Sequence, residues 1–304
     1  STLLYTEFLD TKFNIIDTPG SDDFVGGVYS AFSVAENGIL LVNATQGVEV
    51  GTEIFARHAV KHQKPLIIAV NQLDHEKQDW QATIDSLKAT FGNKVVLVQY
   101  PVNPGVDFDT FIDVLKMKMY KFKDENGTRE SFEIPEEYKE EALALHQQLV
   151  EMAAENDETL METFFEKGQL TEDEIRAGMK VGMQLGDILP VFCLSAKKDI
   201  GVKRIMEFTI NAGITPDKVD NLTKEGEAVK VDSNGPTSIF VYKTAQEQHL
   251  GDVSYFKVMS GKLTEGMDVV NPETGAKERI AQIYAVAGKK REKVTEVMAG
   301  DIAC

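Results

Sequence analysis

The stretch LIIAVNQLD, from Leu66 to Asp74, decides the fold. Its first five residues are apolar and mostly β-branched, a pattern typical of a short strand that is buried on both faces. Asn71 and Asp74 follow where that strand is expected to end. Three similar apolar runs occur at Phe13–Ile16, Ile39–Val42 and Val95–Val98. Buried strands of this kind predict a parallel sheet, whose ligands bind beyond the carboxyl ends of the strands.

Helical periodicity lies between these strands. The stretches that we expect to be helical are Val25–Ala35, Thr52–His62 and Gln78–Phe91. In the last one, Trp80, Ile84, Leu87 and Phe91 recur at a spacing of three or four residues and form one apolar face. Alternation of strand and helix predicts a doubly wound α/β domain.

This alternation stops near Tyr100 and resumes at Pro190–Ala196, followed by a helix around Val202–Ile210. The stretch Phe111–Phe122 between them fits a strand or a short hairpin. Helices are expected from Pro135 onward, over Glu158–Phe165 and over Glu172–Leu185, the last opened by a Thr171/Glu174 capping box. We therefore predict a domain core formed by residues 1–99 and 190–215, with an α+β insertion over residues 100–189.

The character of the sequence changes after Pro216. Short apolar runs are separated there by turns rich in Gly, Asn and Pro. This pattern predicts an all-β domain over residues 216–304, built as a small barrel.

Charge and cysteine content exclude several classes of protein. The net charge of −17 argues against simple attraction to bare nucleic acid. From Glu133 to Arg176, fourteen acidic residues face three basic ones. Such a run is usually a solvated helical face, and a docking surface for a basic partner is the alternative. Two cysteines and the absence of a long apolar run predict a cytoplasmic protein without a membrane segment.

Three motifs lie at predicted strand ends, in the order Ile15–Gly20 (IIDTPG), Ala69–Asp74 (AVNQLD) and Cys193–Lys198 (CLSAKK). Together they resemble a GTP-binding domain. The alternative is that Asn71 and Asp74 cap a nearby helix and that Asp17 caps a turn. The resemblance implies that GTP or GDP contacts Asp17, Thr18, Pro19, Gly20, Asn71, Gln72, Asp74, Ser195, Ala196 and Lys197.

The same resemblance implies a role for the main residues. Asp17 would hold Mg²⁺ through a water molecule, and the N–H of Gly20 would bind the γ-phosphate. Asp74 would accept hydrogen bonds from guanine N1–H and the N2 amine, while Asn71 braces the loop and reaches N7. The Ala196 N–H would donate to guanine O6, and the aliphatic stem of Lys197 would lie against the base.

The whole chain is similar to the translational GTPases, most closely to the elongation factor G family. The matching stretches are DTPGSDDF, ATQGVEVGTE, the insertion from IPEEY to TEDEI, PVFCLSAKKDIGV, YFKVMSGKLTEGMDVVN and AGDIAC. The resemblance implies a monomeric factor that acts on the ribosome in translocation. It also implies contacts with ribosomal RNA and with the stalk proteins, the latter through the acidic insertion.

Some features of the family are missing or altered. No G-x-x-x-x-G-K-[ST] phosphate loop occurs in these residues. We therefore regard the sequence as a fragment that is not expected to be active by itself, and we expect GTP, GDP and Mg²⁺ to bind the parent protein but to bind this fragment weakly or not at all. Ser21 stands where the family usually has a histidine that positions the attacking water, and Asp22 where it has valine. Gln72 stands in place of the usual lysine.

These departures predict impaired GTP hydrolysis in the parent protein, with guanine preference retained at weaker affinity. Three readings stay open beside this one. The substitutions are single-residue drift in a working enzyme, the protein is a ribosome-binding factor that does not hydrolyse GTP, or it is a ribosomal protection protein or release factor that shares these domains.

Overall fold

The computed structural model describes residues 1–124, 126–219, 221–223, 226–247 and 251–304. For Asp22 within the first range, only the backbone is described. By their contacts these residues form two compact units. One unit is continuous and runs from Asn37 to Ile214. The other combines the two ends of the chain, Ser1–Glu36 and Thr215–Cys304.

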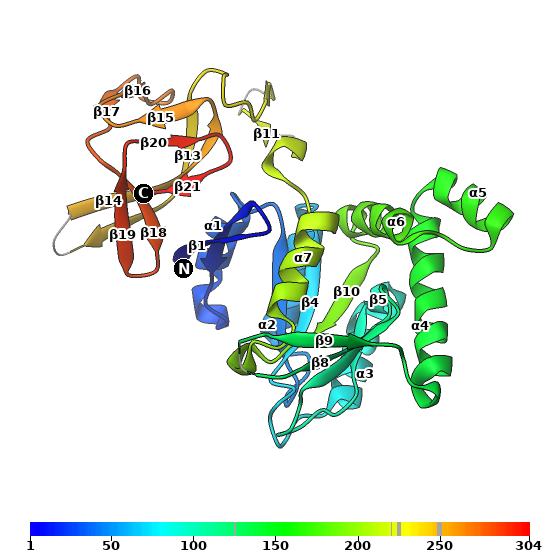
Figure 1. Cartoon of the computed structure of the whole chain (residues 1–304). Coiled ribbons are helices and arrows are strands. Elements are labelled where there is room, and N and C mark those ends of the chain that lie inside the picture. Colours follow the sequence, from blue (N-terminus) through cyan, green and yellow to red (C-terminus); the bar gives the residue numbers. More distant parts are fainter. Residues whose placement is uncertain (125, 220, 224–225, 248–250) are drawn as a thin grey trace. The chain divides into compact units, whose positions relative to one another are not determined.

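A four-stranded parallel sheet forms the centre of the unit Asn37–Ile214 (Figure 1). Its strands, in spatial order, are β3 (Gly38–Asn43), β4 (Leu66–Asn71), β10 (Leu189–Cys193) and β5 (Val95–Leu97). All neighbours pair in parallel. The prediction that three of the apolar runs and the strand near Pro190 share one parallel sheet is confirmed.

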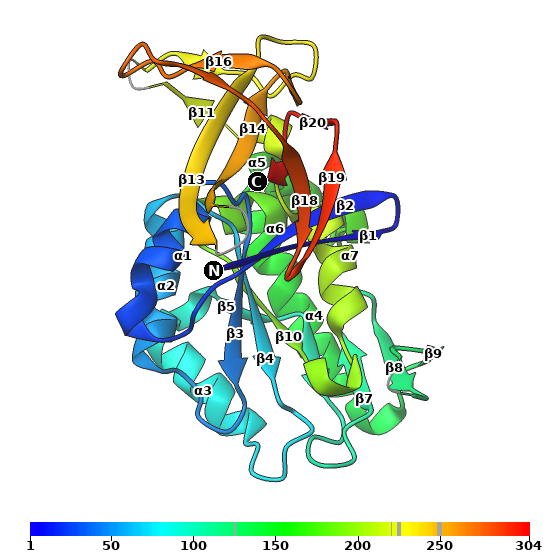
Figure 2. The same cartoon turned by 90° about the vertical axis from the view of Figure 1, so that its left-hand side faces the viewer.

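Helices cover both faces of this sheet. Helices α2 (Val50–Lys61) and α3 (Trp80–Phe91) lie on one side of it, and α7 (Val202–Ala212) lies on the other (Figure 2). The predicted doubly wound arrangement is therefore confirmed, because connections between parallel strands must cross a face of the sheet.

The insertion contains a second sheet and three helices. Strands β6 (Gln99–Pro101), β7 (Thr110–Asp113), β8 (Lys118–Phe122) and β9 (Arg129–Phe132) pair antiparallel in that order. Phe111–Phe122 was expected to be either a strand or a short hairpin, and it forms the hairpin. Helices α4 (Glu136–Glu155), α5 (Glu158–Lys167) and α6 (Glu172–Leu185) follow. The capping box is present, since the Thr171 hydroxyl accepts from the Glu174 N–H at 3.3 Å and the Glu174 carboxylate accepts from the Thr171 N–H at 2.7 Å.

One hydrophobic core joins the sheet to the insertion. It includes Ala69 and Phe192 from the parallel sheet, Ile112 from β7, and Leu149 and Met179 from α4 and α6, all of them fully buried. Removing this much apolar surface from water is the main stabilising contribution in such a domain. The insertion is therefore a structural part of this unit, and its first strands lie beside the sheet that carries the predicted base-binding motifs.

The other unit begins with a hairpin that the sequence did not predict correctly. Phe13–Ile16 was expected as a doubly buried strand of the parallel sheet, but it lies in β2 (Thr11–Asp17), which pairs antiparallel with β1 (Thr2–Phe8). The two-residue turn Leu9–Asp10 has φ values of 47° and 55°, which is the geometry of a tight type I′ hairpin. This turn fixes β2 as one of two ribbon strands, and Ile15 is 42% exposed.

A short 3₁₀ turn, η1 (Asp22–Phe24), and helix α1 (Val25–Phe32) complete the N-terminal part. The C-terminal part is all β, with a 3₁₀ turn η4 (Pro216–Lys218) at its start. Its strands are β11 (Asn221–Leu222), β12 (Ala228–Val229), β13 (Ser238–Glu247), β14 (Gly251–Ser260), β15 (Lys262–Thr264), β16 (Asp268–Val270), β17 (Lys277–Arg279), β18 (Ile283–Ala287), β19 (Lys290–Val294), β20 (Glu296–Met298) and β21 (Ile302–Ala303). Every strand pair described there is antiparallel, which confirms the predicted all-β character.

The N-terminal residues are anchored to this β part. Leu3 and Val34 belong to a core that includes Tyr242, Tyr255 and Ile302. Lys257 on β14 is 2% exposed, donates to the Val34 carbonyl at 2.8 Å and forms an ion pair with Glu36. The first 36 residues thus cluster with the β part, although the sequence assigned them to the core of the first domain. The domain boundaries stay a prediction.

Within the described residues, no helix is both long enough and apolar enough to cross a membrane.

Candidate guanine-nucleotide site

Two of the three predicted motifs meet at one edge of the parallel sheet. Asn71 ends β4, and Ser195 lies two residues beyond the end of β10, which is the neighbour of β4 in the sheet. The carboxyl ends of parallel neighbours lie side by side, so the two loops emerge together. The Asn71 side-chain oxygen accepts a hydrogen bond from the Ala196 N–H at 3.0 Å. This contact ties the AVNQLD and CLSAKK motifs into one site.

A hollow of about 640 Å³ lies at this junction. It is lined by Asn71, Gln72, Asp74, His75, Glu76, Val106 and Lys197. Among the described residues, neither the Asp74 carboxylate nor the Lys197 ammonium has a hydrogen-bond or ion-pair partner. An ionised carboxylate only accepts hydrogen bonds, so Asp74 offers acceptors to a ligand that presents adjacent N–H donors. The N1–H and N2 amine of guanine have that arrangement.

The alternative role for Asn71 and Asp74, as caps of the next helix, is wrong. Helix α3 begins at Trp80 and is capped by Asp79, whose carboxylate accepts from the Ala82 N–H at 2.9 Å. An N-terminal helix cap satisfies backbone donors in the first turn, and Asp79 fulfils that role here.

Backbone bonds hold the CLSAKK loop in one shape. Ser195 is fully buried, and its N–H and carbonyl pair with the carbonyl and N–H of Ile200, both at 3.0 Å. Its hydroxyl accepts from the Lys198 N–H at 3.3 Å. Gly201 closes the loop at a φ of +88°, and a Cβ there would lie 2.2 Å from the Cys193 carbonyl oxygen. Ser195 therefore shapes the loop from inside, while Ala196 and Lys197 remain exposed.

Two of the predicted nucleotide contacts have particular geometry. The Ala196 N–H, which we expect to donate to guanine O6, is bonded to Asn71 in this structure. Gln72 is exposed and adopts a φ of +65°, a left-handed conformation that residues other than glycine adopt infrequently. This backbone turns sharply after β4 and presents the Gln72 side chain at the rim of the hollow.

A buried polar network connects this site to the insertion. The Gln99 amide oxygen accepts from the Cys193 N–H at 3.1 Å, and the Gln99 amide nitrogen donates to Asp113 at 3.3 Å. Asp113 forms an ion pair with Arg204 at 2.6 Å, and both side chains are fully buried. The Arg204 guanidinium also lies 5.9 Å from the ring centres of Phe192 and Phe208, where aromatic faces attract a cation.

Electrostatics within this network are governed by the ion pair. Burial by itself raises the pKa of the Asp113 carboxyl, but the charge of Arg204 and hydrogen bonds from Arg204, Lys116 and Gln99 outweigh it and hold that pKa below its usual value. Burial also raises the pKa of the Cys193 thiol, so Cys193 is a neutral core residue. Among described groups, Nη1 and Nη2 of Arg204 have no hydrogen-bond partner, which leaves Asp113 as the counter-charge.

The residues predicted to contact Mg²⁺ and the γ-phosphate belong to the other compact unit. Asp17 is exposed at the end of β2, and Thr18 and Pro19 are half-buried. Gly20 is exposed, and a Cβ there would meet no atom within 4 Å. Ser21 is also exposed, with its carbonyl accepting from the Phe24 N–H at 3.0 Å. The side chain of Asp22, whose charge we expected to disfavour phosphate, lies outside the described residues.

The metal-binding prediction rests on one carboxylate. Within the described residues, no group of three or more His, Cys, Asp or Glu side chains could hold a metal ion. Mg²⁺ usually keeps several waters and binds one or two carboxylates together with substrate phosphates. A single exposed Asp17 fits that mode, in which the nucleotide supplies the remaining ligands, and it does not fit a metal held by protein alone.

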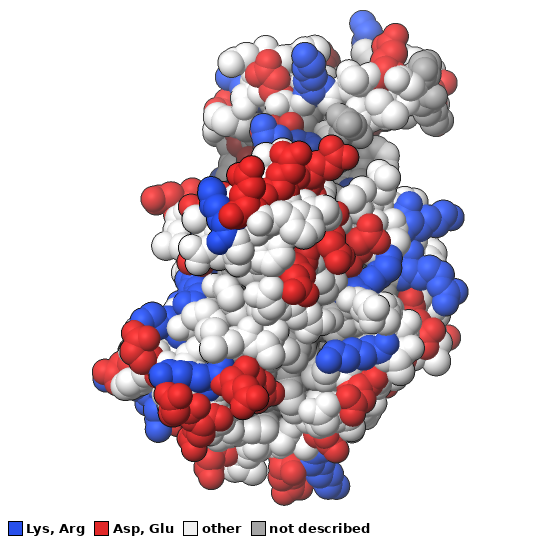
Figure 3. All heavy atoms as spheres, turned by 90° about the vertical axis from the view of Figure 1, so that its right-hand side faces the viewer, with Lys and Arg blue, Asp and Glu red and all other residues white. Residues whose placement is uncertain are grey.

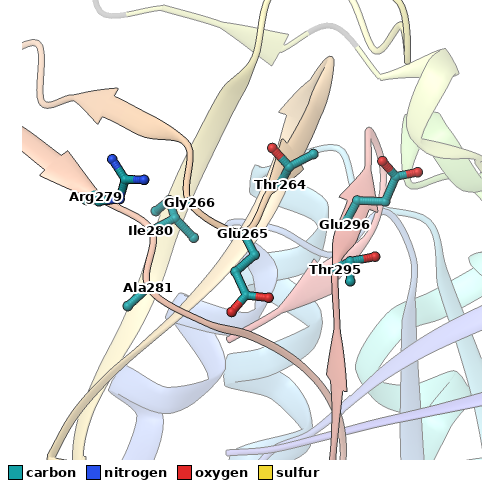
Figure 4. A pocket seen from close by; sticks show the side chains of 8 residues that line it. All are labelled: Thr264, Glu265, Gly266, Arg279, Ile280, Ala281, Thr295 and Glu296. Atoms are coloured by element: carbon teal, nitrogen blue, oxygen red, sulfur yellow. The ribbon is translucent and has the colours of Figure 1, made fainter.

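A second hollow, of about 580 Å³, lies in the β part (Figure 4). Thr264 on β15 and Glu296 on β20 are directly paired across the two strands. Figure 4 shows the Glu265 side chain between the two strands. Glu265 pairs with Lys293 at 2.8 Å, Glu296 with Lys262 at 3.5 Å, and Arg279 with Asp268 at 3.6 Å. Each of the three charged side chains that line this hollow, Glu265, Glu296 and Arg279, already forms an ion pair with another residue of the protein. Within the described residues, the hollow therefore offers a ligand no unpaired charge.

The acidic run of the insertion falls on α4, α5 and α6. Lys139 and Arg176 neutralise acids locally through pairs with Glu136, Glu172 and Asp173. Figure 3 views the molecule from the side on which these helices lie in Figure 1, and red side chains gather in several patches there.

The hollow of about 640 Å³ that Asn71, Asp74 and Lys197 line is called the base-side hollow from here on. Three of its residues were not predicted from the sequence. His75 and Glu76 directly follow Asp74, so their closeness could have been foreseen from the motif. Val106 could not, because it lies more than thirty residues further along the chain, in the loop between β6 and β7. Tertiary packing of the insertion alone brings it to this edge.

Comparison with known proteins agrees with this geometry. Residues 1–213 match the model of the elongation factor Tu GTP-binding domain, and residues 236–303 match that of elongation factor G domain 2. Elongation factor G of Thermotoga neapolitana is 34% identical over 300 residues, which cover 96% of this chain and 43% of that protein. A crystal structure of a protein from Thermus thermophilus superimposes with a TM-score of 0.85 at 26% identity, covering 99% of this chain and 43% of the other.

The chain therefore spans less than half the length of the relatives that it matches. The first family model covers more than half of the residues, and it includes all three motifs at the strand ends. The base-side loops, the parallel sheet and the antiparallel β part occur in the order that this match requires. The chain belongs to the translational GTPases of the elongation factor G type.

Proposed function

We propose that this chain forms the guanine-nucleotide-binding and second domains of a factor that acts on the ribosome in translocation, and that GTP hydrolysis in the parent protein is impaired. The observation that supports the nucleotide site best is the Asn71–Ala196 hydrogen bond, which joins two separate motifs around one hollow. In this proposal the first domain comprises residues 1–99 and 190–215 with its insertion at 100–189, and the second comprises residues 216–304.

Recognition of the base rests on Asp74. Its carboxylate accepts from two adjacent donors on guanine, whereas adenine presents an acceptor at N1 and no amine at C2. A site built to hydrogen-bond a particular edge rejects analogues strongly, because a mismatch leaves buried polar groups unpaired. Asn71 orients the Ala196 loop, Ser195 fixes the shape of that loop, and the Lys197 stem covers part of the base.

On the phosphate side, Asp17 would hold Mg²⁺ through a water molecule, Thr18 and Pro19 would shape the turn, and the Gly20 N–H would bind the γ-phosphate. Mg²⁺, when bound, neutralises charge on the phosphates. Positioning and electrostatic stabilisation supply nearly all of the catalysis in phosphoryl transfer. The hydroxymethyl side chain of Ser21 is short and neutral, so it orients an attacking water poorly.

A first experiment tests guanine recognition in the 304-residue chain. Binding of GDP and ADP is measured by isothermal titration calorimetry, and we expect a preference for GDP. Asp74→Asn should lose this preference and gain affinity for xanthosine diphosphate, because the asparagine amide donates to the C2 carbonyl of xanthine while its oxygen still accepts from N1–H. Equal binding of GDP and ADP by the unmodified chain would contradict the nucleotide site.

A second experiment tests hydrolysis. Ribosome-stimulated phosphate release by the intact parent protein should be slow, and Ser21→His should raise it by at least about 10-fold if water positioning is the missing element. A rate in the unmodified parent equal to that of an ordinary elongation factor G would show that Ser21 is a neutral substitution in an active enzyme.

The same parent protein distinguishes the remaining alternatives. Movement of tRNA and mRNA supports translocation, whereas nucleotide-dependent ribosome binding without movement supports a binding factor, a release factor or a protection protein. Ser21 and Gln72 favour the non-hydrolysing factor as the second candidate, since both lie in motifs that contact the nucleotide. We further propose that ribosomal RNA and the stalk proteins are the partners, the stalk through the acidic insertion, and that the protein is a cytoplasmic monomer.

A further inference from the structure

Val106 is an apolar side chain in the base-side hollow that none of the three sequence motifs contains. It is 62% exposed and lines the same hollow as Asn71, Asp74 and Lys197. A single exposed valine is ordinary on a protein surface. A valine held in place beside uncommitted hydrogen-bonding groups is different, because pockets for flat ligands combine a few polar groups with apolar walls.

The loop that carries Val106 is fastened to both base-binding motifs. The Gly105 N–H donates to the carbonyl of Leu73, inside AVNQLD, at 2.7 Å. The Lys198 ammonium, inside CLSAKK, donates to the carbonyl of Val106 itself at 2.6 Å. Val106 therefore keeps a fixed place relative to both motifs.

Further bonds stiffen the loop from within. Phe108 is fully buried, and its N–H donates to the Gly105 carbonyl at 2.8 Å. The Asn103 amide donates to the Asp107 carbonyl at 2.9 Å and accepts from the Thr110 N–H at 3.0 Å. Gly105 has a φ of +122°, a conformation that a residue with a Cβ rarely adopts. The backbone thus holds Val106 in place before any ligand arrives, and preorganised groups lose little freedom on binding.

A purine has two faces as well as a hydrogen-bonding edge. Asp74, Asn71 and the Ala196 loop address the edge, and the Lys197 stem can cover one face. Gln72 is polar and exposed at the rim, and its shorter stem offers less aliphatic surface than a lysine would. Val106 is the large aliphatic side chain among the residues that line the hollow.

We propose that Val106 packs against the face of the guanine base that Lys197 leaves open, and that it makes up for part of the stacking surface that Gln72 does not supply. This inference rests on the proposed nucleotide function. It assigns to the insertion a direct role in holding the base, through a residue outside the three motifs.

The test uses the 304-residue chain with guanosine, which carries the base without phosphates. Valine methyl groups are labelled with ¹³C, and intermolecular nuclear Overhauser effects to the guanine H8 and ribose H1′ protons are recorded. We expect cross-peaks from one valine, and their loss in Val106→Ala identifies it. Guanosine affinity should fall about four-fold in Val106→Ala, since part of two methyl contacts is lost, and should stay within about two-fold in Val106→Leu.

Val50→Ala is the matched control, because Val50 is 66% exposed in the same unit and does not line the hollow. It should leave both affinity and cross-peaks unchanged. Unchanged guanosine binding in Val106→Ala, with no methyl cross-peak in the unmodified chain, would overturn the role of Val106 alone, provided that Asp74→Asn still abolishes binding. If the unmodified chain does not bind guanosine, or binds adenosine equally, the proposed function falls together with this inference.

Discussion

The two groups of predicted nucleotide-binding residues, one in each compact unit, are built differently. On the base side, Ser195 is fully buried, Asn71 bonds to Ala196, and the Gly105 loop bonds to both motifs. On the phosphate side, Asp17, Gly20 and Ser21 are exposed, and α1 has no side-chain cap and carries two glycines in its first turn. Glycines in a helix cost stability. The base-side loops are therefore held by several hydrogen bonds within their own unit, while the segment Asp17–Ser21 makes few such bonds among the described residues.

Two substitutions relative to the family pattern, Ser21 and Gln72, lie in these two different environments. Ser21 lies in the segment with few internal bonds, so its replacement disturbs little of the fold. Gln72 lies at the rim of the base-side hollow, where its side chain is exposed and has no hydrogen-bond partner among the described residues. Both substitutions are thus compatible with a stable protein, and their effects are expected in binding and turnover.

The largest expected effect tests the support beneath the base side. Asp113→Asn should lower the free energy of unfolding by about 3–5 kcal/mol, because it removes the carboxylate charge that is hydrogen-bonded to the fully buried Arg204 cation. Urea unfolding followed by the fluorescence of Trp80, the single tryptophan and a residue of the same unit, measures this loss. Glu133→Gln is the control, since it breaks an exposed ion pair with Lys118 and should cost no more than about 0.5 kcal/mol.

The same pair predicts a dependence on pH. Arg204 holds the pKa of Asp113 below its ordinary value, so its stabilising contribution is present above the unfolded pKa and is lost as pH falls through the folded one. Stability from this pair should stay constant above about pH 4 and decline below it. In Asp113→Leu/Arg204→Met this decline should be smaller. A double variant that loses stability with acid as steeply as the unmodified chain would show that other carboxylates dominate.

A glycine comparison tests the rigidity of the two sides directly. Gly201→Ala should destabilise the protein by about 2–4 kcal/mol, because its left-handed backbone and the nearby Cys193 carbonyl leave no room for a Cβ. Gly20→Ala should change stability by less than about 0.5 kcal/mol, since no atom lies near the added methyl. Chemical denaturation of both variants checks this. Similar losses at the two positions would remove the contrast between the base side and the phosphate side.

A smaller effect is expected where the phosphate-side segment joins the β part. Glu36→Gln removes the counter-charge of buried Lys257 and should cost about 1–3 kcal/mol, less than a fully buried pair because Glu36 is partly exposed. Faster hydrogen–deuterium exchange in α1 and β14 would report the loosening. Glu7→Gln on β1 is the control, as Glu7 is exposed and should leave exchange unchanged. Unaltered exchange in Glu36→Gln would mean that the apolar contacts alone hold the segment.

The smallest effect concerns the rim. Gln72→Lys should raise GDP affinity about two- to five-fold, by attraction between the ammonium and the phosphates, with stability unchanged within about 0.5 kcal/mol. Gln63→Lys is a close match, because Gln63 is exposed and also has a left-handed φ, of 51°. The gain should shrink at high salt. An equal gain in both variants would show a general effect of charge.

Sequence patterns predicted the unit Asn37–Ile214 and the all-β character of residues after Pro216 well, and the N-terminal hairpin poorly. The runs at Leu66 and Val95 are buried on both faces, as their apolar character predicts. The run at Ile39 was expected to be buried on both faces too, but Ile39 and Leu41 are 51% and 58% exposed, because β3 packs with one face only. Phe13–Ile16 has the same composition but lies in a ribbon, and the Leu9–Asp10 turn that determines this lacks the glycine or asparagine that marks such turns. Local composition could not distinguish these two environments.

Prediction of the site followed the same division. Asn71, Asp74 and Ser195 were recognisable because their motifs have fixed spacing at strand ends. Val106 and the pair Asp113–Arg204 carry no local signal, since a valine in a loop and a charged pair about ninety residues apart gain their meaning only when the insertion folds onto the sheet. Residues predicted to bind the base edge lie in recognisable sequence motifs. Residues that support the site or line it from another part of the chain do not need to lie in a motif.

The ion pair between Lys257 and Glu36 has a consequence for synthesis of the chain. Its partners are separated by 221 residues, and the whole unit Asn37–Ile214 is made in between. At about 5–20 residues per second, Glu36 is added to the growing chain roughly 10–45 seconds before Lys257. The middle of the chain can fold during that interval, but the hairpin and α1 must wait for their contacts with the β part. The segment that begins the sequence is therefore among the last to reach its native contacts.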